Sequence, residues 1–159
     1  MRNYRKFSFL LFLLAACNAD DHHQEQEFLH YWYYTNSEVN ITERNGITIA
    51  GINNGSKLVF EFQYSLDRDP EIIDDEYGEQ ILFEVEPDKL QFEYKDQQLL
   101  AIKAYFNCTF PGTGSISLNR GSIKGEKTSE NTWELQIDVE FLMAAHIERR
   151  QLGATFVLN

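Results

Sequence analysis

The ten residues Thr132–Phe141, TWELQIDVEF, decide the fold class of this chain. Apolar residues occupy every odd position from Trp133 to Phe141, and polar residues occupy every even position. Because successive side chains of a β-strand point to opposite faces, this alternation predicts a strand with one face in a core and one face in water.

The same alternation recurs along the chain, in stretches rich in aromatic and branched side chains, as strands prefer. These stretches are Leu58–Tyr64, Ile81–Val85, Leu90–Tyr94 and Leu100–Phe106. Turn pairs such as Asn45-Gly46 and Asn54-Gly55 separate strands, since Asn and Gly tolerate a positive φ. No long helical pattern alternates with the strands, which disfavours a parallel sheet. We predict an all-β domain at residues 28–159, either an antiparallel β-sandwich or an up-and-down β-barrel of about eight strands.

Two segments depart from this simple pattern. Inward positions change from even to odd between Leu118 and Ile123, so we expect a bulge or bend around residues 119–121. The stretch Phe141–Arg150, FLMAAHIERR, is rich in helix-forming Leu, Met and Ala. We therefore predict one short helix near the C-terminus, before a final strand at Ala154–Leu158.

The composition supports a folded, acidic domain. Hydrophobic residues make up 43% of the 159 residues and the net charge is −11. Residues 1–16 hold three basic residues and no acid, so their removal takes the net charge to −14. Nucleic acid is disfavoured as a partner, because its phosphates need Lys and Arg. The charge keeps the domain soluble and is also suited to a basic protein partner.

The first 17 residues have the layout of a targeting segment. Met1–Lys6 is basic, Phe7–Leu14 is apolar, and the small residues Ala15 and Ala16 come directly before Cys17. The apolar run is much shorter than the roughly 20 residues that a spanning helix needs. We interpret residues 1–16 as a signal peptide.

The sequence Leu14-Ala15-Ala16-Cys17 resembles the lipobox of bacterial lipoproteins. This resemblance implies cleavage before Cys17, a diacylglycerol on its sulfur and an acyl group on the new amino terminus. Several acyl chains hold a hydrophilic domain stably on a membrane. The next residues, Asn18–Asp21, resemble the export signal of surface-exposed lipoproteins of Bacteroidota, with Asn18 departing from the commonest residue there. The resemblance implies an outer-membrane protein exposed at the cell surface, with the periplasmic face as the alternative.

Residues 17–27 form the expected tether between the lipid and the domain. Asp20–Glu27, DDHHQEQE, has no apolar residue and is typical of a flexible acidic spacer. The ten residues 18–27 extend at most about 33 Å, enough to lift the domain clear of lipid headgroups.

Four consecutive aromatic residues form one candidate binding site. In a strand, Trp32 and Tyr34 face one way while Tyr31 and Tyr33 face the other. One pair can enter the core and leave the other exposed for contact with a sugar or a protein. The alternative is a first strand that packs both of its faces.

The acidic run of residues 67–79, DRDPEIIDDEYGE, is the second candidate. Its candidate ligand residues are Asp67, Asp69, Asp74, Asp75 and Glu76. Clustered carboxylates suit Ca²⁺, but the run lacks the Gly and Glu positions of an EF-hand loop. We interpret it as a solvated loop between two strands, with a calcium site as the alternative.

The sequence contains none of the common catalytic signatures, and it implies no cofactor. Cys108 shares the inward parity of Phe106, so we expect it to be buried and inert. The first hypothesis is a non-enzymatic lipoprotein that binds a protein or glycan. The second is an immunity or inhibitor lipoprotein that neutralises a basic toxin or enzyme, and the third is a small calcium-dependent hydrolase.

Overall fold

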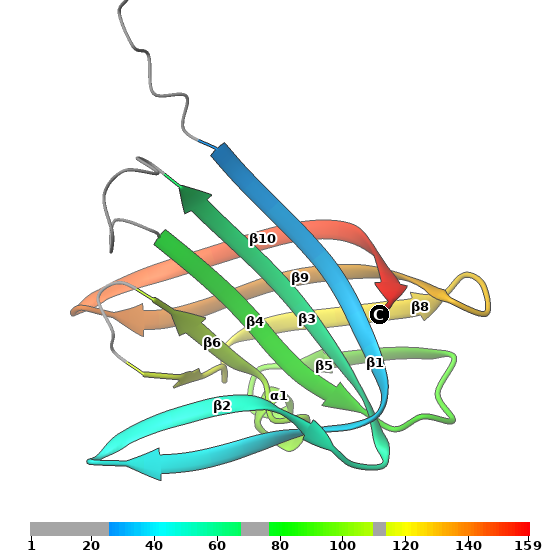
Figure 1. The fold of residues 1–159 in the computed structure, drawn as a ribbon, viewed down its shortest axis with the longest axis horizontal. Coiled ribbons are helices and arrows are strands. Elements are labelled where there is room, and N and C mark those ends of the chain that lie inside the picture. Colours follow the sequence, from blue (N-terminus) through cyan, green and yellow to red (C-terminus); the bar gives the residue numbers. More distant parts are fainter. Residues whose placement is uncertain (1–25, 68–76, 110–113) are drawn as a thin grey trace, which may run out of the picture.

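The computed structural model describes residues 26–67, 77–109 and 114–159. These residues form ten strands and one short helix (Figure 1). The elements are β1 (Gln26–Arg44), β2 (Ile47–Asn54), β3 (Lys57–Asp67), β4 (Tyr77–Val85), β5 (Gln91–Lys95), α1 (Gln98–Ala101), β6 (Tyr105–Cys108), β7 (Ile116–Ser117), β8 (Gly121–Lys127), β9 (Thr132–Met143) and β10 (His146–Leu158). The prediction of an all-β fold is confirmed.

All ten strands belong to one sheet, in the order β5-β8-β9-β10-β1-β3-β4-β6-β7, with β2 paired to β1. Every pair is antiparallel except β1 with β10, where Trp32 pairs with Val157 in parallel register. The sheet curls into a half-barrel, so its β5-β8-β9-β10 part faces its β1-β3-β4-β6 part (Figure 1). The sheet is therefore mixed, because the first and last long strands of the chain lie side by side in the same direction.

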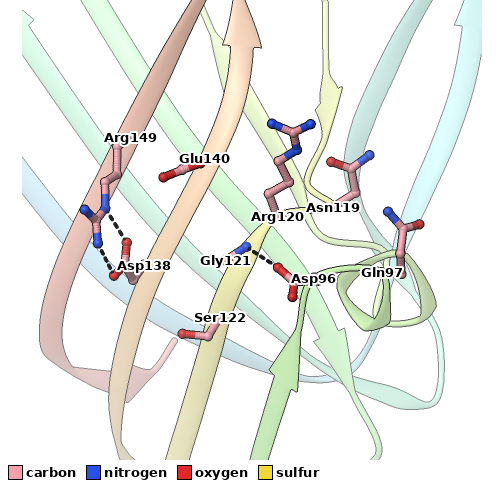
Figure 2. A pocket seen from close by; sticks show the side chains of 9 residues that line it. All are labelled: Asp96, Gln97, Asn119, Arg120, Gly121, Ser122, Asp138, Glu140 and Arg149. Atoms are coloured by element: carbon pink, nitrogen blue, oxygen red, sulfur yellow. Dashed lines mark hydrogen bonds and ion pairs between the residues drawn. The ribbon is translucent and has the colours of Figure 1, made fainter.

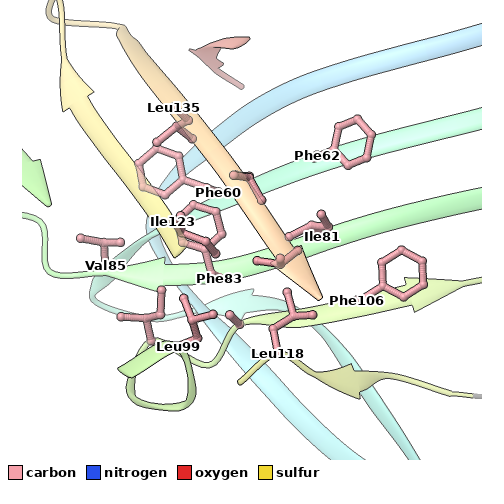
Figure 3. Close-up of a cluster of buried hydrophobic side chains, with 14 of the residues drawn as sticks. Phe60, Phe62, Ile81, Phe83, Val85, Leu99, Phe106, Leu118, Ile123 and Leu135 are labelled. Carbon is pink, nitrogen blue, oxygen red and sulfur yellow. The ribbon is translucent and has the colours of Figure 1, made fainter. Parts of the chain in front are cut away.

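The core fills the space between these two parts of the sheet (Figure 3). Phe60 of β3 lies at its centre, with its ring 5.1 Å from that of Phe83 and 5.3 Å from that of Trp133. The five odd-numbered residues of Thr132–Phe141 are all buried, as the alternation predicts. Burial of each such side chain contributes about 1.5–3 kcal/mol, which makes this face of the sheet the main source of stability.

A smaller cluster lies on the opposite face of β3 and β4. Val59 and Leu82 point away from the main core and pack against Val39 and Ala50 of the β1–β2 hairpin. β1 reaches this position because its register shifts between Tyr34 and Ser37, where the backbone departs from a regular strand. The hairpin therefore covers the outer face of β3 and β4.

Two local predictions are corrected by the structure. The stretch 141–150 is not helical: it forms the β9–β10 hairpin, in which Leu142 pairs with Ile147 across the turn. The short helix of the described residues is α1 instead, within a stretch predicted to be a strand. The expected bend near residue 120 is present, since the chain bends at Arg120 between β7 and β8, and Gly121, the first residue of β8, has φ +103°.

Candidate functional site

The outer face of β8, β9 and β10 carries a continuous set of polar side chains. Its members point away from the core because their neighbours along each strand point into it. They are Ser122, Lys124 and Glu126 of β8, Glu134, Gln136, Asp138 and Glu140 of β9, and Arg149, Gln151 and Thr155 of β10. The strands hold these side chains at fixed spacings, which is what a binding surface needs.

Three of the pockets along this face share lining residues from one to the next. The first has a volume of about 540 Å³, the second about 710 Å³ and the third about 340 Å³. Ser122 and Asp138 line both the first and the second pocket. Lys124, Gln136 and Gly153 line both the second and the third. The three pockets therefore lie side by side across the strands, and we call this row of pockets the outer groove.

Gly153 keeps the middle of the outer groove open. A Cβ atom built at this position would meet only the Leu135 carbonyl oxygen, at 3.8 Å. The space that a side chain of Gly153 would occupy is therefore part of the groove.

One end of the outer groove is strongly charged (Figure 2). Arg149 donates from Nε to Asp138 Oδ1 at 2.7 Å and from Nη2 to Asp138 Oδ2 at 2.6 Å. These bonds lower the pKa of Asp138 and raise that of Arg149, so both groups stay ionised near neutral pH. Arg120, from the loop before β8, has no carboxylate partner among the described residues and is available to a ligand.

At this end of the outer groove, two backbone segments approach each other closely. The Gly121 amide donates to Asp96 Oδ1 at 3.0 Å, and the Asp96 amide donates to the Gly121 carbonyl at 2.8 Å. A Cβ at Gly121 would lie 2.1 Å from the Asp138 carbonyl oxygen, so only glycine fits here. The reciprocal bonds fix the loop that carries Arg120 relative to the turn after β5.

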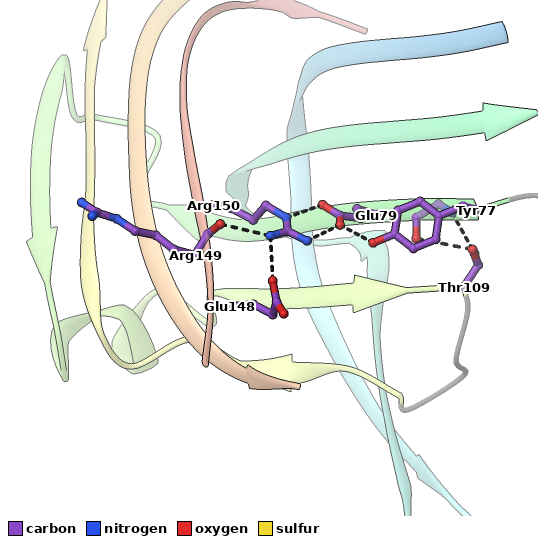
Figure 4. A network of polar contacts seen from close by, with 7 residues as sticks. Tyr77, Glu79, Thr109, Glu148, Arg149 and Arg150 are labelled. Carbon is purple, nitrogen blue, oxygen red and sulfur yellow. Dashed lines mark hydrogen bonds and ion pairs between the residues drawn. The ribbon is translucent and has the colours of Figure 1, made fainter. Parts of the chain in front are cut away.

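A second polar cluster lies on the inner face, at the end of the half-barrel where β4 begins (Figure 4). Arg150 donates to both carboxylate oxygens of Glu79, at 2.7 and 2.5 Å, and the Tyr77 hydroxyl donates to the same carboxylate. The Arg150 guanidinium also lies 5.9 Å from the ring centroid of Phe106 and 5.7 Å from that of Phe141. Both ionic groups are thus enclosed by partners from four strands.

The electrostatics of this cluster favour a structural role. Burial would raise the pKa of Glu79, but the hydrogen bonds from Arg150 and Tyr77 outweigh it and hold that pKa below its usual value. Burial and the same carboxylate raise the pKa of Tyr77. A general acid or base needs a pKa near the working pH, whereas these shifts fix each group in its ordinary ionisation state.

The four predicted aromatic residues divide between the two faces of β1 as expected. Tyr33 is buried in the core and Tyr31 packs against it, while Trp32 and Tyr34 are half-buried on the outer face. Tyr34 donates to Glu61 Oε2 at 2.5 Å and accepts from Asn159, and burial together with Glu61 raises its pKa to about 12. Both outward rings have protein neighbours, since Trp32 stacks on His30 at 4.4 Å. The outward side of β1 is therefore packed more closely against protein than a site exposed to a sugar or a protein ligand would be.

The remaining predicted residues are only partly described. Cys17 and the acids Asp69, Asp74, Asp75 and Glu76 lie outside the described residues. Asp67 ends β3, and Glu79, at the other end of the acidic run, belongs to the inner cluster. Cys108 is buried, as its parity predicts.

Within residues 26–67, 77–109 and 114–159, no group of three or more His, Cys, Asp or Glu side chains is placed to hold a metal ion. In the same residues no helix is long and apolar enough to span a membrane.

The sequence pattern does not reveal the outer groove. The polar residues of Thr132–Phe141 indicate only the solvated side of a strand. Their sequence signal is real but incomplete, because the groove also needs the polar faces of β8 and β10, whose pairing with β9 no local pattern reveals.

No protein-family model, curated protein or solved structure matches this chain.

Proposed function

We propose that this chain is a non-enzymatic envelope lipoprotein, anchored to the outer membrane through Cys17 and exposed at the cell surface, whose β-domain binds a glycan or protein in the outer groove. The observation that carries the binding proposal is the groove itself, with its three connected pockets on a rigid strand surface. The lipobox and the acidic residues that follow it support the anchor and the location.

The lining of the outer groove favours a glycan among these ligands. Its middle is formed by the amides Gln136 and Gln151 and by the charged Glu93 and Lys124, all of which have groups that can donate or accept hydrogen bonds. Side chains on one face of a strand repeat about every 6.6–6.8 Å, so an extended polar chain can meet several donors and acceptors in succession. A long, polar groove suits such a ligand better than it suits a compact apolar molecule, which prefers an enclosed apolar pocket.

The ionic groups of the outer groove support binding rather than catalysis. The pKa of Asp138 is lowered and that of Arg149 is raised. Acid–base catalysis at neutral pH needs the opposite shifts, which bring a carboxylic acid up or a base down toward the working pH.

Filling the groove tests the proposal. Gly153→Tyr places a large side chain into the groove at a position with open space, and Tyr is a favourable strand residue. Gly51→Tyr is the matched control, since Gly51 of β2 likewise has room for a Cβ, which would meet nothing within 4 Å. On glycan arrays and in envelope pull-downs, we expect wild type and Gly51→Tyr to bind the same ligand and Gly153→Tyr to lose it at least tenfold. Equal binding by both variants, or no ligand of either kind for wild type, would count against the groove.

The acidic charge supports a second candidate, an immunity or inhibitor lipoprotein for a basic toxin or enzyme. Much of that charge lies outside the described strands: residues 68–76 carry five acids and one Arg, and residues 18–25 carry three acids. Affinity for such a partner should fall steeply with salt, and it should not change in Gly153→Tyr.

If the chain is instead a calcium-dependent hydrolase, calorimetry should detect the heat of Ca²⁺ binding. Substitution of the acids of residues 67–76 should abolish that heat.

A further inference from the structure

Several strands and turns gather at the end of the half-barrel where the described chain begins. Gln26 of β1 pairs with Asp67, the last residue of β3, and β4 begins beside it. β10 runs parallel to β1, so the β9–β10 turn lies at this end as well. Asn107, near the end of β6, donates to the carbonyl of Ala50, which brings the turn of the β1–β2 hairpin to the same end. All of these features lie toward the left of Figure 1, and we call this the entry end.

Exposed apolar side chains are concentrated at the entry end. Seven of the eleven large hydrophobic residues that are exposed in the described chain lie there: Phe28, Leu29, Ile41, Ile47, Ile49, Leu142 and Ile147. Leu142 and Ile147 form a cross-strand pair at the tip of the β9–β10 hairpin and are 64% and 65% exposed. Such a concentration marks an interaction surface, whereas exposed apolar residues scattered singly need no explanation.

The charge of the two hairpin tips differs from that of the rest of the chain. Residues 142–147, LMAAHI, contain no acid, and residues 41–49 contain one acid and one base, in a chain with a net charge of −11. Locally neutral, apolar tips are suited to the boundary between lipid headgroups and acyl chains.

The position of the anchor identifies the occupant. Eight residues separate Cys17 from Gln26, so the lipidated sulfur lies at most about 30 Å from the entry end. β10 alone has 13 residues, with a contour length of about 40 Å. The connection to the lipid is therefore shorter than the domain and starts at the apolar end.

We propose that the Leu142–Ile147 and Ile41–Ile49 hairpin tips contact the lipid surface, so that the entry end faces the membrane and the lipid anchor and the hairpins hold the domain in one orientation. This inference rests on the proposed lipid anchor. It revises the expectation that the tether holds the domain clear of the headgroups, because a tether of this length permits contact as well as separation.

Spin labels at two equally exposed leucines test the proposal. Leu142→Cys lies at the hairpin tip, and Leu90→Cys, before β5, is the matched control because Leu90 is 68% exposed at the opposite end. The lipidated protein is reconstituted into zwitterionic phosphatidylcholine vesicles, since anionic lipid would repel a chain with a net charge of −11. Labelled wild type gives the background, because Cys108 is buried.

On vesicles we expect the label at Leu142→Cys to lose accessibility to water-soluble nickel complexes at least threefold and to gain accessibility to oxygen, which concentrates in lipid. The label at Leu90→Cys should change little, and a label at Ile47→Cys should follow the one at Leu142→Cys. Equal changes at the two ends would overturn the proposal. Loss of both relaxants at Leu142→Cys would also overturn it, since that result means cover by protein. Flotation of wild type with the vesicles is measured first. If wild type does not float, both the lipid anchor and this proposal are refuted. If it floats but the label at Leu142→Cys stays accessible to water-soluble nickel complexes, only this proposal is refuted.

Discussion

Replacing Arg150 with leucine should destabilise the domain by an amount that depends on pH. The Glu79 side chain is 7% exposed and Arg150 is 26% exposed, and two charge-assisted hydrogen bonds join them. Arg150→Leu leaves the carboxylate of Glu79 buried without its main partner. Removal of one member of a buried ion pair costs about 3–5 kcal/mol, and leucine restores some of the apolar contact with Phe106 and Phe141. We expect a loss of about 3 kcal/mol in the free energy of unfolding at pH 7.5.

The pH dependence of that loss follows from the pKa of Glu79. In wild type this pKa is lowered, so Glu79 contributes stability above its ordinary pKa of about 4.5, and the contribution is lost as the pH falls through the folded value. In Arg150→Leu, burial dominates and raises the folded pKa above the unfolded one. The variant then binds the proton more tightly when folded, and it gains stability relative to wild type as the pH falls. The difference between the two proteins should shrink to less than half between pH 7.5 and pH 4.

Urea unfolding followed by tryptophan fluorescence measures the difference at both pH values. The adjacent Arg149→Leu is the matched control, because Arg149 lies on the outer face in an exposed pair with Asp138, and such pairs contribute little. We expect its midpoint to lie close to that of wild type. The double variant Glu79→Leu/Arg150→Leu should recover most of the stability, because it leaves no buried charge. A loss in Arg150→Leu that is the same at pH 7.5 and pH 4, or no larger than in Arg149→Leu, would refute the reasoning.

Three further predictions concern a turn, a close backbone approach and the anchor. Ala145 has φ +69° in the β9–β10 turn, so Ala145→Gly should raise the free energy of unfolding by about 1 kcal/mol; a lower urea midpoint would contradict the strain assigned to this turn. Gly121→Ala should destabilise the domain by several kcal/mol, because its Cβ would lie 2.1 Å from the Asp138 carbonyl oxygen, and a midpoint within error of wild type would show that the loop moves freely. Cys17→Ala should move the protein from the detergent-extracted membrane fraction to the soluble fraction, and intact mass should show an uncleaved leader without acyl groups; retention in the membrane fraction would remove the anchor.

The strand content could be predicted from the sequence because it depends on local alternation. In Thr132–Phe141 each apolar residue is buried, and in Leu58–Tyr64 the even positions face the core in the same way. Such patterns report which face of a strand is wet, and they need no knowledge of the neighbouring strand.

The pairing of the strands could not be predicted in the same way. Residues 86–89 form a turn between β4 and β5, as their sequence indicates, yet β5 pairs with β8 and lies at the opposite edge of the sheet from β6 and β7. β1 pairs with both β3 and β10. Its pairing with β10 brings together the first and the last strand of the described chain. These choices are set by packing across the core, for which one sequence holds no local signal.

The two errors over helices have separate causes. Residues Leu99 and Ile102 are both buried and lie three positions apart, so a single helical turn places them on one face, whereas a strand would point them to opposite faces. In the β9–β10 hairpin, pairing along the whole length of β9 outweighs the helix propensity of Met143, Ala144 and Ala145. Ala144 and Ala145 adopt positive φ values to close this turn, at positions where Asn or Gly is the usual choice.

The outward-facing residues of each strand also indicate which outer face remains available for a ligand. In β3 and β4 the outward positions mix apolar Val59 and Leu82 with polar side chains, and the β1–β2 hairpin covers them. In β9 the outward positions from Thr132 to Glu140 are entirely polar, and no element of the described chain packs over them. Because a covering element must bury apolar contacts to be stable, the purely polar face is the one that the fold leaves open, and the outer groove lies on it. Any substitution that makes this face apolar, such as Gln136→Leu, should therefore leave the core intact while weakening hydrogen bonding to the proposed ligand, which separates the proposed function of this face from the stability of the sheet.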